Sequence, residues 1–138
     1  SDWTTLSEKT IADAVSQANS IGVKVQYLTI TTSASCLVSL DENYKPVMNS
    51  ILVSDARAKN EDLYIDELSE FQKIKNLGFK SSPDLMLPKI LWIKRNQSET
   101  YDKCRYFCNI SDYLYYHFTG KFASDPITSL KFFYLKPN

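Results

Sequence analysis

The stretch CLVSLDENYKPVMNSILV, residues 36–53, decides the fold that the sequence predicts. Its first five residues are mostly apolar and predict a strand over 36–40. Residues 41–46 carry Asp, Asn and Pro, which are typical of a turn. Residues 47–53 return to apolar types and predict a second strand, so the whole stretch indicates a β-hairpin.

Upstream of the hairpin the sequence predicts a helix followed by a strand. Thr5-Leu6-Ser7-Glu8 fits a capping box, and apolar residues at helical spacing predict a helix over 6–20 that ends near Gly22. Residues 23–30, VKVQYLTI, alternate and are rich in β-branched and aromatic types, which indicates a strand. A short polar segment, residues 31–35, joins this strand to the hairpin.

Downstream of the hairpin, helical patterns dominate. A long helix is predicted over 57–76, with a buried stripe and a glycine just past its end at Gly78; the stripe is Leu63, Leu68, Phe71 and Ile74. Pro88 suits the first turn of a helix that carries Ile90, Leu91 and Ile93.

The C-terminal third continues the alternation of strands and helices. Tyr106-Phe107-Cys108 predicts a short strand, and Ser111 is expected to cap a helix that runs to Phe118 and stops at Gly120. Helices that alternate with strands favour the α/β class.

Composition fits one compact domain. The chain has 138 residues, 43% of them hydrophobic and 23% charged, which is a globular balance. Its 16 basic and 16 acidic residues cancel, so nucleic acid is not an expected partner. Since no apolar run approaches a membrane span, a membrane is not expected either.

The cysteines indicate a reducing compartment. Cys36, Cys104 and Cys108 are an odd number, whereas secreted disulfide frameworks usually pair all their thiols. We therefore expect buried free thiols and a cytoplasmic protein. No second cysteine pair exists and His117 is the single histidine, so a four-ligand zinc site is not expected.

Four motifs, in this order, resemble the FGGY family of carbohydrate kinases. They are the hairpin phrase Leu40-Asp41-Glu42-Asn43-Tyr44-Lys45-Pro46; Ser54-Asp55-Ala56-Arg57-Ala58; Pro88-Lys89-Ile90-Leu91-Trp92; and Asp112-Tyr113-Leu114 followed by Thr119-Gly120-Lys121-Phe122 and Ser124-Asp125. The resemblance covers nearly all of residues 3–135. It implies a partial ribonuclease H-like (actin-like ATPase) domain with a β-hairpin and surrounding helices. Residues 1–138 would then be a single partial domain, the sugar-binding portion of that family's N-terminal domain.

The same resemblance implies an enzyme that uses ATP and Mg²⁺ to phosphorylate a sugar such as xylulose or ribulose. The family's aspartate-x-glycine-threonine phosphate hairpin and its catalytic aspartate do not occur in this sequence. The resemblance therefore implies a fragment of a longer kinase, with no catalytic residue, metal ligand or cofactor of its own. We expect the isolated chain to be inactive.

For sugar binding, the resemblance points to Ser33 and Ser35, where xylulokinases carry glutamine and histidine of a glutamine-methionine-histidine motif, and to Asp55. The residues themselves leave alternatives open. Short hydroxyls at the carboxyl end of a strand suit a sugar, but they also suit ordinary turn polarity. Asp55 suits a sugar contact or a helix cap, with Arg57 paired to a surface acid.

Two aromatic-rich positions fit structural roles better than chemistry. Trp92 stands at helical spacing beside apolar residues and is expected in the core rather than on a sugar. His117, with no nucleophile in its context, is expected to be structural or on the surface.

Two other functions compete with a kinase fragment. A non-catalytic carbohydrate-binding or interaction module describes how the isolated chain is expected to behave. A nuclease of the same architecture needs clustered carboxylates, which no predicted strand carries. Because the resemblance places residues 23–30 beside a strand that this sequence lacks, we also expect homodimers through an exposed sheet edge.

Overall fold

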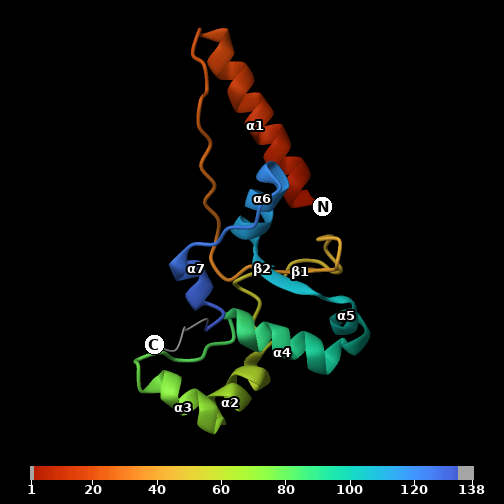
Figure 1. Cartoon of the computed structure of the whole chain (residues 1–138), viewed down its shortest axis with the longest axis vertical. Coiled ribbons are helices and arrows are strands. Elements are labelled where there is room, and N and C mark those ends of the chain that lie inside the picture. The colour runs from red at the N-terminus through yellow and green to blue at the C-terminus, as the bar shows by residue number, and fades with distance from the viewer. Residues whose placement is uncertain (1, 134–138) are drawn as a thin grey trace.

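The computed structural model describes residues 2–133. These residues form a small antiparallel sheet with helices on both sides (Figure 1). In chain order the elements are α1 Asp2–Ser20, β1 Leu37–Leu40, α2 Lys59–Glu67, α3 Ser69–Lys75, α4 Met86–Asn96, α5 Ser98–Lys103, β2 Tyr106–Asn109, α6 Ile110–Thr119 and α7 Pro126–Leu130. The predicted α/β class is confirmed.

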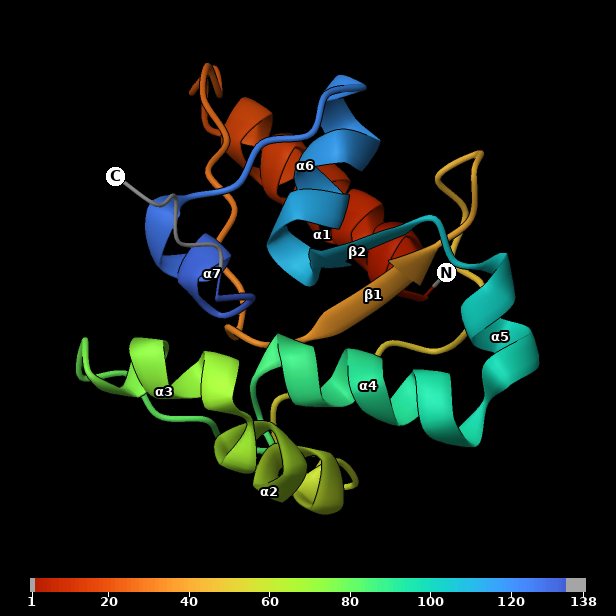
Figure 2. The same cartoon turned by 60° about the horizontal axis from the view of Figure 1, so that its bottom comes forward.

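The sheet pairs β1 with β2 in antiparallel register, from Leu37 opposite Asn109 to Leu40 opposite Tyr106. Successive side chains of a strand point to opposite faces. Val38 and Leu40 therefore pack with Cys108 against α6, while Leu37 packs with Ile93 of α4. Figure 2 shows α4 on one side of the two strands and α6 on the other. The strand predicted at Tyr106–Cys108 is confirmed.

The prediction of a continuous second hairpin strand over residues 47–53 is wrong. Residues 46–53 do return antiparallel to β1, but they meet it only through isolated bridges, Leu37 to Ile51 and Leu40 to Pro46. Pro46 has no N–H to donate to a ladder. The Ser50 hydroxyl donates to the carbonyl of Leu37 at 2.9 Å, which places a side chain at the sheet edge between the two bridges.

The strand predicted over residues 23–30 is also wrong. The segment is extended and runs beside α1 (Figure 1), but no strand of the described chain pairs with it. Tyr27 is 89% exposed and Val25 is 45% exposed. Strand propensity reflects packing on neighbouring strands, and residues 2–133 offer this segment no such neighbour.

The helix predicted over 57–76 is two helices, α2 and α3, separated by Leu68 in an extended conformation. In one straight helix, Ile65 and Phe71 would point about 120° apart. The break lets both become 97% buried. The predicted stripe is wrong at Leu63, which is 63% exposed.

The helices α1, α4 and α6 agree with the sequence apart from their first residues, whereas α5 and α7 have no predicted counterpart. α1 begins at Asp2, so the expected capping box at Thr5-Leu6-Ser7-Glu8 lies inside the helix and is wrong. Pro88 lies in the first turn of α4, as predicted. The N-cap of α6 is Asn109 rather than Ser111. Gly120 ends α6 with a φ of 70°, a left-handed conformation that glycine adopts without a Cβ penalty.

Long-range polar contacts join the helices to the sheet. Asn109 is buried, and its Oδ1 accepts a hydrogen bond from the backbone N–H of Cys36 at 3.1 Å. Its own N–H donates to the Asp112 carboxylate at 3.2 Å, the backward half of a capping box. His117 contacts Glu8 of α1 at 2.7 Å, which fits its expected structural role.

All three cysteines are free and buried, as predicted. Burial raises the pKa of the Cys108 thiol to about 12, and the nearby Asp112 adds to the shift. Within residues 2–133, no helix combines the length and apolar character needed to cross a membrane.

Candidate functional site

A cavity of about 420 Å³ lies where the polar segment 31–35 meets the start of α1 and the residues after the hairpin. Five hydroxyl-bearing residues line it: Ser7, Thr31, Thr32, Ser33 and Ser54. The remaining wall is mainly apolar, formed by Trp3, Cys36, Leu52, Val53, Ile110 and Leu114. Several hydroxyls over an apolar floor, in a cavity of this volume, are typical of a small polar ligand.

A second and larger cavity, of about 770 Å³, shares Trp3, Leu52 and Ile110 with the first. It lies between the start of α1 and residues 46–50, and it adds the polar groups of Asp2, Asn49, Ser50 and Tyr113. Trp3 is 44% exposed. Its indole therefore forms an aromatic wall that both cavities share.

Beside the hydroxyl-lined cavity the backbone takes an unusual turn at Ser35. This residue has a φ of 64°, a left-handed conformation that is uncommon for residues with a Cβ. Ser35 is also 99% buried. Such conformations persist where the surrounding structure holds them.

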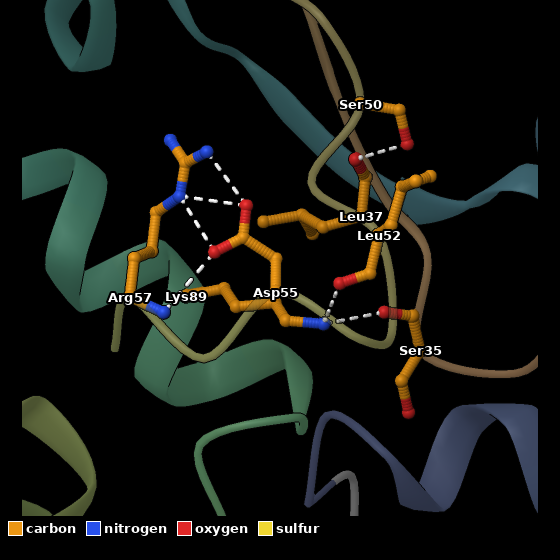
Figure 3. Close-up of polar contacts among 7 residues, drawn as sticks. All are labelled: Ser35, Leu37, Ser50, Leu52, Asp55, Arg57 and Lys89. Carbon is orange, nitrogen blue, oxygen red and sulfur yellow. Dashed lines mark hydrogen bonds and ion pairs between the residues drawn. The ribbon is translucent and has the colours of Figure 1, made fainter. Parts of the chain in front are cut away.

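The group that holds this turn is the buried amino group of Lys89. The side chain is 0% exposed, and its Nζ donates to the carbonyl oxygen of Ser35 at 2.7 Å and to that of Leu52 at 2.9 Å (Figure 3). Burial lowers the pKa of Lys89, while Cys36, Asp84 and Asp55 oppose that shift. Lys89 thus joins the segment 31–35 to the residues that follow the turn after β1.

Asp55 lies on the other side of Lys89 and faces Arg57 (Figure 3). The Nε of Arg57 is 2.9 Å from each Asp55 oxygen, and its second amino nitrogen is 2.6 Å from Oδ2. These hydrogen bonds hold the pKa of Asp55 below its usual value. The guanidinium also lies 4.8 Å from the centre of the Trp92 ring, a cation–π contact.

The expectation that Asp55 caps a helix is wrong, because α2 begins at Lys59 after an N-cap at Ala58. The acid paired with Arg57 is Asp55 itself. Trp92 is half-buried against the α4 side of the core, near Met86 and Ile93, as its spacing predicted.

The structure thus places the three candidate sugar-binding residues differently. Ser33 lines the hydroxyl-lined cavity. Ser35 lies in the wall behind it, where its backbone carbonyl binds Lys89. Asp55 is not among the described lining residues, and its carboxylate is engaged by Arg57.

Residues 1–129 match the model of the N-terminal domain of the FGGY family of carbohydrate kinases. The chain belongs to this family. Xylulose kinase of Lactococcus lactis subsp. lactis (strain IL1403) is 26% identical over 126 residues, which cover 89% of this FGGY chain and 25% of that relative. Gluconokinase of Bacillus subtilis (strain 168) is 23% identical over 103 residues, or 74% of the chain and 20% of the relative. The chain therefore spans about a quarter or less of these relatives.

Solved FGGY-family structures give the same picture. A xylulose kinase from Brucella ovis aligns with a TM-score of 0.56 at 25% identity, covering 61% of this chain and 17% of that one. A ligand-bound xylulose kinase from Lactobacillus acidophilus aligns with a TM-score of 0.68 at 22% identity, covering 78% and 22%. The second likeness shows the fold alone.

The described residues of this FGGY chain hold no cluster of three metal-ligating side chains and no glycine-rich phosphate loop. Among residues 2–133, no three His, Cys, Asp or Glu side chains group as metal ligands. Gly22, Gly78 and Gly120 lie at helix ends or in the turns that follow them, rather than in one phosphate-binding loop. No step of phosphoryl transfer is therefore assigned to these residues.

Sequence reasoning missed Lys89, Trp3 and Ser54 as members of the site. A signal for Lys89 was present, since it is the one charged residue within the run Met86-Leu87-Pro88-Lys89-Ile90-Leu91-Trp92-Ile93. Charged side chains are rarely fully buried unless they are paired, so a lysine in such a run indicates a specific buried acceptor. Trp3 and Ser54 gave no comparable signal.

Proposed function

We propose that this chain is the sugar-binding portion of the N-terminal domain of an FGGY carbohydrate kinase, spanning residues 1–138 of a ribonuclease H-like fold. In the complete kinase, ATP and Mg²⁺ would bind outside this chain. The kinase would then transfer a phosphoryl group from ATP to a pentulose such as xylulose or ribulose. The three buried free thiols support a cytoplasmic location. The chain supplies binding groups, and we expect no turnover from it alone.

The observation that carries the proposal is the hydroxyl-lined cavity at the segment 31–35. Hydroxyls donate and accept hydrogen bonds, so they can pair with sugar hydroxyls in either sense. Trp3 offers an amphipathic ring wall against which the carbon face of a sugar could pack. Ser33 is the candidate residue that faces this space.

The cavity chemistry favours a neutral ketose over an aldonate. None of the described residues that line the cavity carries a charge. A gluconate carboxylate would need a cationic or strong donor partner, whereas a pentulose carries only hydroxyls and a carbonyl. This contrast supports a substrate like that named for the xylulose kinase relatives rather than the gluconokinase relative.

The test compares Ser33→Ala and Ser35→Ala in the complete kinase, with Ser98→Ala on α5 as a matched control. If Ser33 holds the sugar mainly by uniform binding, Ser33→Ala should raise the KM for the pentulose about threefold or more while kcat changes less. Ser35→Ala should raise the KM less, because Ser35 lies behind the cavity wall. Unchanged kinetics in both variants would reject the assignment. Turnover by the repurified chain alone, in a coupled ATP assay, would reject its inactivity.

A second candidate is a non-catalytic module that binds carbohydrate or another protein chain. The extended segment 23–30 favours it, because Val25 and Tyr27 lie exposed and no strand within residues 2–133 pairs with the segment. On this basis we propose homodimers through that segment. Phosphorylation of a pentulose by the complete protein separates the two candidates, because both of them can bind sugar.

A further inference from the structure

We propose that Lys89 is a positioning residue for sugar binding: its side-chain amino group fixes the backbone of the two wall segments of the hydroxyl-lined cavity relative to each other. The inference rests on the proposed function for the sugar itself. It goes beyond that function by assigning a role to a residue that does not line the cavity.

The contacts show that one nitrogen atom joins two cavity walls. Ser35 lies between Ser33 and Cys36, which both line the cavity, and Leu52 lines it directly. Lys89 donates to the carbonyls of Ser35 and Leu52 from α4. A shift of either segment would therefore lengthen one of these two hydrogen bonds.

The conformation of Ser35 explains why such a contact is needed. With a φ of 64°, this residue turns the chain between the segment 31–35 and the start of β1. A left-handed residue with a Cβ is strained unless its surroundings hold it. Here the carbonyl oxygen of Ser35 accepts a hydrogen bond from the Lys89 amino group at 2.7 Å.

A role limited to filling space fits these contacts less well. Met86, on the same helix, is equally buried at 0% exposed and contributes only apolar contacts to the core. A methionine at position 89 would fill a similar volume and avoid the desolvation of an amino group. The lysine adds two hydrogen bonds to backbone carbonyls, which a methionine side chain cannot form.

Asp55 and Arg57 complete the surroundings of the amino group. Burial lowers the pKa of Lys89, while the charges of Cys36, Asp84 and Asp55 oppose that shift. Arg57 holds Asp55 in place through three side-chain hydrogen bonds.

The test uses Lys89→Met, Lys89→Arg and the control Lys94→Met, which changes an exposed lysine on the same helix. Amide hydrogen exchange on the complete protein is the first measurement. For Lys89→Met, exchange should speed up about tenfold or more at residues 31–36 and 52–54, with β2 and α6 unchanged. Lys89→Arg should recover part of the protection. Unchanged exchange, or a uniform rise along the chain, would overturn the positioning role.

The second measurement is the kinetic effect in the complete kinase. Lys89→Met should raise the KM for the pentulose about tenfold, with kcat changed by less than about threefold, while Lys94→Met matches the unmodified enzyme. A KM equal to that of Lys94→Met would overturn the link between Lys89 and sugar binding. If exchange changes as expected but Ser33→Ala and Lys89→Met both leave KM unaltered, the proposed sugar site fails and the backbone role of Lys89 stands.

Discussion

Replacing Asn109 with alanine should lower the free energy of unfolding more than the same replacement of an asparagine on the protein surface. Asn109 is 1% exposed, and its amide links the start of β1 to the start of α6 by accepting from the N–H of Cys36 and donating to the Ser111 hydroxyl at 3.1 Å. Alanine removes both bonds and leaves the N–H of Cys36 buried without this acceptor. An orphaned buried backbone donor costs about 1–3 kcal/mol.

For a chain of this length, each kcal/mol lowers Tm by roughly 3 °C, so Asn109→Ala should melt about 3–10 °C below the unmodified protein. Urea unfolding followed by circular dichroism gives the free energy directly, with the m-value as a check that the unfolded state is unchanged.

Asn96→Ala is the matched control, because Asn96 is exposed and its Nδ2 donates only at the surface of α4, to the Trp92 carbonyl at 3.0 Å. Its effect should stay within about 0.5 kcal/mol. If Asn109→Ala and Asn96→Ala unfold at the same urea concentration, the hydrogen bond between Asn109 and Cys36 does not stabilise the protein.

Three further predictions follow from separate features. Gly120→Ala should lose about 1 kcal/mol in urea unfolding, because the φ of 70° disfavours a Cβ although the space around it is open; a neutral effect would contradict this. Arg57 lowers the pKa of Asp55, so the stability that this carboxylate contributes is present above its unfolded pKa and is lost as pH falls through its lower folded pKa. The urea midpoint of Asp55→Asn should therefore lie below that of the unmodified protein above about pH 4 and converge with it in stronger acid; a constant difference would exclude this linkage. Light scattering of the chain should show concentration-dependent dimers through residues 23–30, which a Val25→Lys change should weaken; a monomer at every concentration would reject this interface.

The sequence predicted well the elements whose signals are local. The first turn of α4 at Pro88 and the glycine stop at Gly120 depend on φ preferences of single residues. The strand at Tyr106–Cys108 is short and apolar, and the pattern identified it directly. For the two helix signals the decisive interaction lies within a few residues, whereas the strand also depends on pairing with the distant β1.

Elements that depend on distant partners were predicted poorly. Residues 23–30 have strand propensity, but pairing requires a second strand that residues 2–133 do not provide. The break at Leu68 follows from burying both Ile65 and Phe71 against distant parts of the fold. The role of Lys89 depends on carbonyls 54 and 37 residues away in the chain, and no local pattern specifies those acceptors.

The three buried cysteines give this chain a set of internal chemical reporters. Alkylating reagents attack the thiolate, and a thiol with a pKa near 12 is almost wholly protonated at neutral pH. Cys108 lies in β2, opposite Val38 of β1, and is buried. Its labelling by iodoacetamide would therefore require the sheet to open. The rate of carbamidomethylation, read by mass spectrometry, would measure how often that opening occurs without any added probe.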